Sequence, residues 1–354
     1  MNPNGWRPLL GIGVVLMLVL AACQGGAGAS EPAPDGSSGG GSGSGEIFVS
    51  GSSTVEPITN AVAEAFAAQS SGFEYTVEGP GTGDGFALFC NGETDISDAS
   101  RAISEEEIAE CEANGVAYAE LLVAFDGLSV ITSADNADVT CLSFLDLYAL
   151  LGPESEGFAS WSDANDLAAE LEAELGDEFG ASNAPYPDAS LDVTAPGEES
   201  GTYDSFVEIV FGDISEARLE AGAITEEQVA TSRIDYTASA NDNVIVENVA
   251  GSASSLGWVG LAFASGADGI TSFEVDGGGG CVAPSGDTVA DESYPISRPL
   301  YIYPSLASVE GNPAVAPFVD FYVSDEGLAL AGEVGYVALT AEQAQATRDA
   351  WEGR

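Results

Sequence analysis

The sequence contains no histidine and no lysine, and its only basic side chains are seven arginines. Nucleic-acid binding requires clusters of basic residues, so a nucleic acid is excluded as a partner. Without histidine, a serine or cysteine nucleophile has no usual base, and Ser200 also lacks the GxSxG frame of a hydrolase. The absence of lysine excludes a phosphate loop of the GxxxxGK[ST] type. These absences argue against an enzyme.

The sequence also lacks an apolar run of membrane-spanning length. The apolar run near the N-terminus covers only Leu9 to Leu20. It follows Arg7 and ends in Leu20-Ala21-Ala22-Cys23, which is typical of a secretory signal peptide and too short for an ordinary spanning helix. Cys23 after Leu-Ala-Ala resembles the bacterial lipobox, in which that cysteine carries the lipid; a plain signal peptide is the alternative. We expect a signal peptide over 1–22 and a protein anchored by lipid on the outer or periplasmic side of the cell membrane.

The segment 23–45 is composed of Gly, Ser, Ala, Pro and acidic residues, with nothing to bury. It is predicted to be a flexible linker between the lipid anchor and the folded body. The body that follows is long enough for two lobes or one large α/β unit.

Acidic residues dominate the charge, with 58 against seven basic ones and a net charge of −51. Removal of the signal peptide leaves six arginines against the same 58 acids, a balance of −52. A hydrophobic content of 45% argues against a disordered body. We interpret the charge as adaptation to a salty medium, in which self-repulsion is screened.

Four cysteines remain besides Cys23, and an even number in an exported chain predicts two disulfides. Cys90 and Cys111 flank one strand-like stretch and one helix and are the first expected pair, which leaves Cys141 with Cys281. A zinc site is the rival, but there is no histidine and no CxxC spacing to support it, so no metal is expected.

Short apolar strand patterns alternate with helical ones along the body, which is typical of an α/β sheet protein. The strands are expected at 46–50, 73–77, 94–97, 121–132, 191–194, 256–263 and 296–303. The helices are expected at 57–69, from 86 onward, at 104–113 (opened by a Ser104–Glu107 capping box), 163–175, up to 211, 314–323 and 340–351.

Two apolar runs of the body, 121–132 and 256–263, are expected to cross between two lobes. The first lobe would then comprise 46–123 and 262–354, and the second 124–261. This arrangement predicts a two-lobed clamp in which both ends of the body lie in the first lobe.

Three turns combine glycine with hydroxyl side chains after a strand and before a helix: Gly51-Ser52-Ser53-Thr54, Gly81-Thr82-Gly83 and Ser200-Gly201-Thr202. A helix N-terminus offers unpaired backbone N–H groups and a partial positive charge, and glycine allows an anion to approach them. Together the turns predict an oxyanion site. Ordinary helix capping is the alternative for each turn.

Ser100 and Arg101 are a fourth candidate, because they fall at a strand end where a guanidinium can pair with an oxyanion. The alternative is a surface salt pair with one of the many acids. Arg233 competes with Arg101 for this role, but Asp235 two residues away offers it a structural partner. We expect Arg101→Ala to weaken anion binding by more than tenfold.

These residues, in order, resemble a known family. Gly51 to Ile58, Asp95 to Arg101, Glu199 to Thr202 and Ser232 to Thr237 are similar to the phosphate-binding lipoproteins (PstS type) of the high-affinity phosphate ABC importer. The resemblance implies a periplasmic-binding-protein-like (type II) clamp of two α/β lobes with a hinge of two crossover strands. It also implies capture of inorganic phosphate and delivery to a membrane permease and its ATPase.

Carried over by the resemblance, the ligand contacts are Ser53, Thr54 and the Val55 amide, then Thr82 and Gly83, and finally Ser200, Gly201 and Thr202. Two departures matter. Some family members have aspartate at the position of Ser100, and an arginine shortly before the Ser-Gly-Thr turn, where this chain has Ala195-Pro196-Gly197. Arg101 is therefore expected to supply the positive charge, and Asp126 is the candidate acceptor for the phosphate proton, with a hinge-turn acid as its alternative.

We thus expect a monomeric solute-binding protein without a cofactor, and not an enzyme. A receptor for another oxyanion, such as sulfate or molybdate, is the alternative in the same class. A secreted phosphatase and a structural surface protein are the alternatives from other classes.

Overall fold

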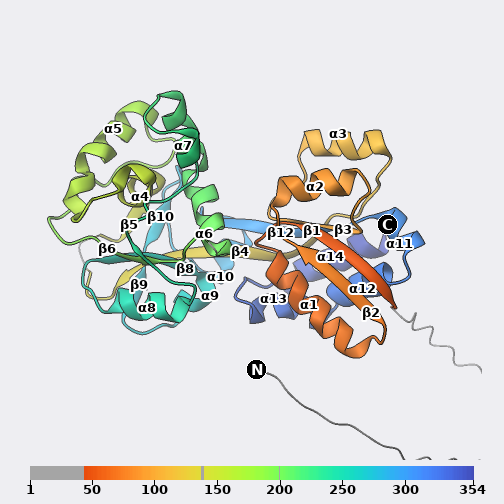
Figure 1. Ribbon diagram of the computed structural model, residues 1–354. Coiled ribbons are helices and arrows are strands. Elements are labelled where there is room, and N and C mark those ends of the chain that lie inside the picture. The colour runs from red at the N-terminus through yellow and green to blue at the C-terminus, as the bar shows by residue number, and fades with distance from the viewer. Residues whose placement is uncertain (1–43, 137–138, 199) are drawn as a thin grey trace, which may run out of the picture. The chain divides into compact units, whose positions relative to one another are not determined.

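Figure 1 shows the computed structural model, which describes residues 44–136, 139–198 and 200–354. The predicted signal peptide, the lipidation site at Cys23 and nearly all of the linker lie outside the described residues. Within them, no helix is both long and apolar enough to cross a membrane.

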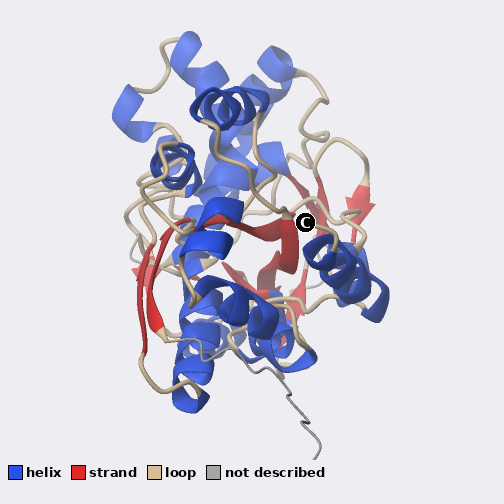
Figure 2. Cartoon of the chain, turned by 90° about the vertical axis from the view of Figure 1, so that its right-hand side faces the viewer, coloured by secondary structure: helices blue, strands red, loops and turns tan. Residues whose placement is uncertain are grey.

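The body is a mixed α/β protein whose helices and strands gather into two lobes, joined by two long strands (Figure 1). Figure 2 shows its helices and strands from the side of the first lobe. The first lobe begins with β1 (Gly45–Gly51), α1 (Glu56–Gln69), β2 (Phe73–Glu78), α2 (Thr82–Cys90), β3 (Ile96–Ala99) and α3 (Glu105–Asn114). The strand β4 (Leu121–Ser133) then leads into the second lobe.

The second lobe contains the elements from β5 to α10. Their bounds are β5 (Cys141–Ser143), α4 (Phe144–Leu151), η1 (Pro153–Ser155), η2 (Trp161–Ala164), α5 (Asn165–Leu175), β6 (Asp192–Ala195), α6 (Gly201–Phe206), the π-helical η3 (Val207–Phe211), α7 (Gly212–Glu220), η4 (Glu226–Gln228), β7 (Thr237–Ala238), α8 (Asp242–Ala250), β8 (Ser255–Gly260), α9 (Leu261–Ala264), β9 (Ile270–Ser272), β10 (Glu274–Asp276), β11 (Cys281–Val282) and α10 (Gly286–Ala290).

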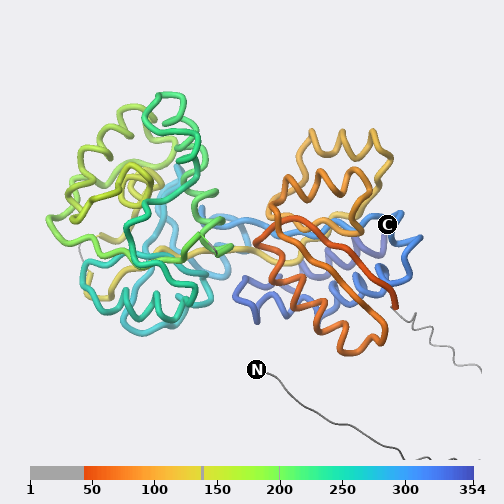
Figure 3. The backbone as a smooth tube through the Cα atoms, in the orientation of Figure 1, coloured from red at the N-terminus to blue at the C-terminus, as the bar shows by residue number. Residues whose placement is uncertain are grey.

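The strand β12 (Ser297–Pro304) returns the chain to the first lobe. That lobe is completed by α11 (Leu306–Gly311), α12 (Val315–Tyr322), α13 (Asp325–Glu333) and α14 (Ala341–Glu352). The tube in Figure 3 shows the two passages of the chain between the lobes, one by β4 and one by β12.

One sheet runs through both lobes in the order β2-β1-β3-β12-β4-β8-β6-β7. The strand β4 is shared: its first half pairs with β12, and its second half pairs with β8 and β9. Its side chains are accordingly divided between two cores, with Val123 in the core of the first lobe and Leu128 and Val130 in the core of the second. The two crossover strands therefore form the connection between the lobes.

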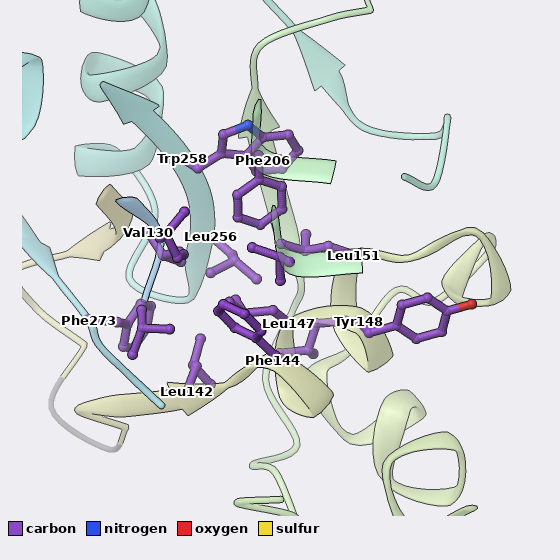
Figure 4. Close-up of a cluster of buried hydrophobic side chains, with 14 of the residues drawn as sticks. Val130, Leu142, Phe144, Leu147, Tyr148, Leu151, Phe206, Leu256, Trp258 and Phe273 are labelled. Atoms are coloured by element: carbon purple, nitrogen blue, oxygen red, sulfur yellow. The ribbon is translucent and has the colours of Figure 1, made fainter. Parts of the chain in front are cut away.

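The core of the second lobe is rich in aromatic and branched side chains, several of which Figure 4 labels. Phe206 stacks on Trp258 with ring centroids 4.3 Å apart, and Val130 of β4 belongs to the same cluster. Burial of such side chains stabilises the lobe by roughly 2 kcal/mol for each large apolar group. Phe206 immediately follows Ser205 and is the last residue of α6, so this stacking holds the junction between α6 and η3 against the core.

Most of the expected helices and strands are confirmed within a few residues, because their apolar periodicity is local. The Ser104–Glu107 capping box of α3 is present, with the Ser104 hydroxyl accepting from the Glu107 amide. Both expected disulfides, Cys90–Cys111 and Cys141–Cys281, are also present. The second links β5 to β11 across 140 residues and so holds the late segment 281–296 to the second lobe.

The prediction that the run 256–263 returns the chain to the first lobe is wrong. Residues 255–260 form β8, which pairs with β4 and β6 inside the second lobe. The segment that follows also stays there, because Phe273, Val289 and Ile296 are buried in the second core. An apolar run buried on both faces looks the same in sequence whether it crosses between lobes or lies inside one.

Candidate anion-binding site

A cavity of about 340 Å³ lies where elements of the two lobes meet. Its wall consists mainly of hydroxyl side chains, glycines and a few charged groups. The lining residues are Ser52, Ser53, Thr54, Gly79, Pro80, Gly81, Thr82, Gly83, Ser100, Arg101, Asp204, Glu208 and Arg298. Of the eleven ligand residues expected from the sequence, the cavity brings together Ser53, Thr54, Thr82, Gly83, Ser100 and Arg101.

The first wall is the turn between β1 and α1. Gly51 is required there, because a Cβ atom would lie 2.0 Å from the carbonyl oxygen of Asp98. The Ser52 hydroxyl accepts from the Thr54 amide at 3.2 Å, so this turn is closed by its own side chain. It leaves Ser53 and Thr54 at the cavity, while Val55 is fully buried and its amide donates to the Ser52 carbonyl oxygen at 3.2 Å.

The second wall is the start of α2, next to the end of β3. Gly81 precedes the helix with φ of +118°, a conformation that other residues rarely adopt. The Thr82 hydroxyl lies 3.0 Å from the Ser100 hydroxyl and accepts from the Ser100 amide at 3.2 Å. Two predicted turns, one at Thr82 and one at Ser100, are therefore one hydrogen-bonded group.

The third predicted turn stands beside the cavity instead of lining it. The Ser200 hydroxyl caps α6 by accepting from the Thr202 amide at 3.2 Å. A Cβ atom on Gly201 would lie 3.4 Å from the Ser53 carbonyl oxygen, so the helix start approaches the first turn closely. Among the residues that the structure describes, Val55, Ser200, Gly201, Thr202 and Asp126 lie outside the cavity lining.

Arg101 reaches the cavity, but its guanidinium is already engaged. Both of its terminal nitrogens donate to the Glu107 carboxylate at 2.8 Å, and the side chain is 44% exposed. Glu107 is held in turn by the capping box of α3. The salt pair that stood as the alternative for Arg101 is thus present. Arg233 lies away from this cavity and pairs with Asp235 at 2.7 Å.

Arg298, the buried cation of the site, is not among the residues predicted from the sequence. Arg298 lies on β12 directly opposite Asp126 on β4, so the two crossover strands carry the pair. Its Nη2 atom donates to the hydroxyl of Thr54 at 2.9 Å and to that of Ser205 at 2.7 Å. The guanidinium therefore connects a turn of the first lobe with a helix of the second. Its only signal in the sequence is that arginines are so few.

Carboxylates surround this cation. Glu208 accepts from the Nη1 atom of Arg298 at 2.6 Å, and Asp126 lies 3.7 Å from its Nε atom. Burial raises the pKa of Asp126, and the charge of Arg298 opposes that shift. Burial also raises the pKa of Asp204, whose carboxylate accepts from the Ser53 hydroxyl at 3.3 Å.

Comparison with known proteins identifies the family to which this architecture belongs. The family model described as a PBP superfamily domain matches residues 36–326. The chain belongs to the PBP superfamily. The protein SphX of Synechocystis is 37% identical over 300 residues, which cover 84% of this chain and 79% of SphX.

The phosphate-binding protein PstS of Staphylococcus epidermidis is 31% identical to this PBP superfamily member over 290 residues, which cover 81% of this chain and 77% of PstS. A crystal structure of a possible phosphate binding protein from Planctomyces limnophilus superposes with a TM-score of 0.74 at 33% identity, over 87% of this chain and 97% of that one. The expected periplasmic-binding-protein-like fold and family are confirmed. PstS is named as a phosphate-binding protein and the Planctomyces limnophilus protein as a possible one, which confirms the expectation that the chain is not an enzyme.

Proposed function

We propose that the protein captures inorganic phosphate between its two lobes and delivers it to the permease and ATPase of an ABC importer. The observation that carries this proposal is a cavity of hydroxyl groups and one buried guanidinium, in a chain whose relatives are named as phosphate-binding proteins. Hydroxyl groups and arginine are suitable donors for the oxygens of a tetrahedral oxyanion. These donors come from the first lobe and the crossover strand β12, and the second lobe contributes Asp204 and Glu208 to the lining.

We propose that Ser53, Thr54, Thr82 and Ser100 donate to the anion and that Arg298, with Arg101 at the rim, supplies positive charge. Gly83 allows close approach to the start of α2. Ser200, Gly201, Thr202 and the Val55 amide stay predictions as direct ligands, since they stand behind or beside the lining. The lobes are best divided as residues 44–124 with 297–354, and residues 125–296.

We propose that Cys23 carries a lipid and that the linker 23–45 holds the monomeric body outside the membrane. The sequence pattern before Cys23 and the content of the linker support this arrangement.

The test is a calorimetric titration of the purified full-length protein, in detergent and high salt, with phosphate and then with sulfate and molybdate. We expect tight binding of phosphate that sulfate cannot displace. Binding of sulfate or molybdate instead would support the alternative of another oxyanion receptor. No heat with any of the three would contradict an anion-binding role.

The acceptor for the phosphate proton is a separate proposal. Hydrogen phosphate carries a P–OH donor that sulfate lacks, so a carboxylate at the ligand admits the first and repels the second. We propose Asp204 for this role, because it lines the cavity, while Asp126 is buried behind Arg298.

We expect Asp204→Asn to reduce the preference for phosphate over sulfate by about tenfold, because an amide both donates and accepts; this corresponds to one charged hydrogen bond. Competition calorimetry measures the preference. Asp126→Asn is the matched comparison and should leave it nearly unchanged. The reverse pattern would return the role to Asp126, the residue expected from the sequence.

A further inference from the structure

The guanidinium of Arg298 has its ends occupied by two different kinds of partner. Its Nη2 atom bonds to the hydroxyls of Thr54 and Ser205, which belong to the framework of the site. Its Nη1 atom bonds to the carboxylate of Glu208 at 2.6 Å. Both Arg298 and Glu208 line the cavity. A carboxylate oxygen therefore occupies the donor that an oxyanion in the cavity would need.

Glu208 is held much more loosely than the other carboxylates that bind the arginines of the site. Its side chain is 63% exposed, whereas those of Asp126 and Glu107 are 6% and 15% exposed. Glu107 is also fixed by the capping box, and Asp126 by its burial on β4. Within the described part of the chain, the Glu208 side chain makes a hydrogen bond only to Arg298. It can therefore leave without breaking any other side-chain hydrogen bond of the described residues.

The position of Glu208 in the helix supports a role at the cavity. It lies in η3, a single π-helical turn between α6 and α7. Such turns insert an extra residue, re-aim side chains and occur frequently at functional sites. Here Ser205 contacts Arg298 and Glu208 follows it three residues later, so both reach the same guanidinium from one side of the helix.

We propose that Glu208 is a resident competitor for the anion, and this inference rests on the proposed function. Its carboxylate accepts from the Nη1 atom of Arg298, and the anion must displace it to bind there. The pair is open to solvent on its Glu208 side, so displacement costs little but is not free. Glu208 then lowers the affinity of the site and slows association.

The experiment compares the full-length wild type with Glu208→Gln by phosphate calorimetry and by stopped-flow tryptophan fluorescence. We expect Glu208→Gln to bind phosphate about fivefold more tightly, the fold-change that corresponds to one exposed ion pair. The gain should come from faster association. The control is Glu216→Gln, an exposed glutamate on α7 that removes the same charge outside the cavity and should leave the affinity unchanged.

A second variant, Glu208→Asp, separates contact from charge because it keeps the charge and shortens the side chain. We expect it to tighten phosphate binding too, by less than Glu208→Gln does. Suppose that Glu208→Asp binds phosphate with wild-type affinity while Glu208→Gln binds it more tightly. The charge of Glu208 alone would then act, and the proposal that Glu208 competes by contact would be overturned.

The results also separate this inference from the proposed function. If the wild type binds phosphate and Glu208→Gln binds it equally or less well, Glu208 only holds Arg298 in position. The proposed competitor role is then overturned, while the proposed function stands. If neither protein binds phosphate, the proposed function fails and the competitor fails with it.

Discussion

Replacement of Arg298 is expected to weaken phosphate binding by about a hundredfold, the loss that corresponds to removing one or two buried charged hydrogen bonds. Arg298 is 9% exposed and joins Thr54 to Ser205. Its loss therefore removes the charge and also the link between the β1–α1 turn and α6. The suitable variant is Arg298→Gln combined with Asp126→Asn. Removing the arginine alone would leave a buried charge at Asp126 without its partner, which destabilises the fold. Calorimetry measures the affinity.

The controls for this prediction are two other arginines. Arg348→Gln, in an ion pair with Asp325 outside the cavity, should bind phosphate like the wild type. Arg101→Ala should weaken binding by only about fivefold, because Glu107 already neutralises a half-exposed guanidinium. This is less than the loss expected from the sequence alone. A larger loss in Arg101→Ala than in the Arg298 variant would restore Arg101 as the principal cation.

Replacing Asp98 with asparagine is expected to stabilise the protein above neutral pH by ~4 kcal/mol. Asp98 lies on β3 beneath the first turn of α1, and neither of its carboxyl oxygens has a hydrogen-bond partner among the described residues. Burial raises its pKa from 3.8 to about 7, Thr59 nearby lowers it, and the charge of Glu56 raises it further. The buried Tyr322 hydroxyl also faces this carboxyl and bonds to Thr59 at 3.0 Å.

The sign of the pH effect follows from that shift. A raised pKa means that the fold favours the protonated carboxyl, so the contribution of Asp98 to stability is intact below about pH 4. It is lost progressively as the pH rises to about 7. Asparagine does not titrate, so the variant and the wild type should be similar at pH 4 and should diverge up to pH 8.

Urea unfolding at pH 4, 6 and 8 measures the difference between the two proteins, which isolates Asp98 from the many other acids. Asp213→Asn, an exposed acid on α7, is the control and should differ from the wild type by no more than ~0.5 kcal/mol at any of these pH values. Lower stability of Asp98→Asn than of the wild type at pH 8 would contradict the prediction and would mean that the carboxylate has a partner in solution.

The parts of the site that could be predicted are those made by neighbours in sequence. The turn from Gly51 to Thr54 follows a strand and precedes a helix, and local chemistry alone fixes that pattern. The same holds for the Ser104–Glu107 capping box and for the pairing of Cys90 with Cys111, which are close along the chain. In each case the partners are separated by one or two elements at most.

Arg298 could not be found in this way, because its role depends on register. Ser297-Arg298-Pro299 reads as an ordinary strand, and only the pairing of β12 with β4 places Arg298 opposite Asp126 and against Thr54. The return of the chain was misplaced for the same reason. The run that forms β8 has the composition of any buried strand, and its neighbours are chosen by partners far along the chain. Long-range pairing is the information that composition and periodicity lack.

The position of β12 has a consequence for how the chain reaches its native state. This strand is near the C-terminal end of the sequence, yet it lies between β3 and β4 in the middle of the sheet. A polypeptide that emerges N-terminus first therefore has a gap at the centre of its sheet until residues 297–304 have appeared. Such late, non-local pairing slows folding and leaves strand edges exposed meanwhile. The nascent chain thus needs protection from aggregation until the strand that carries Arg298 arrives, and only then do hinge and ligand site form together.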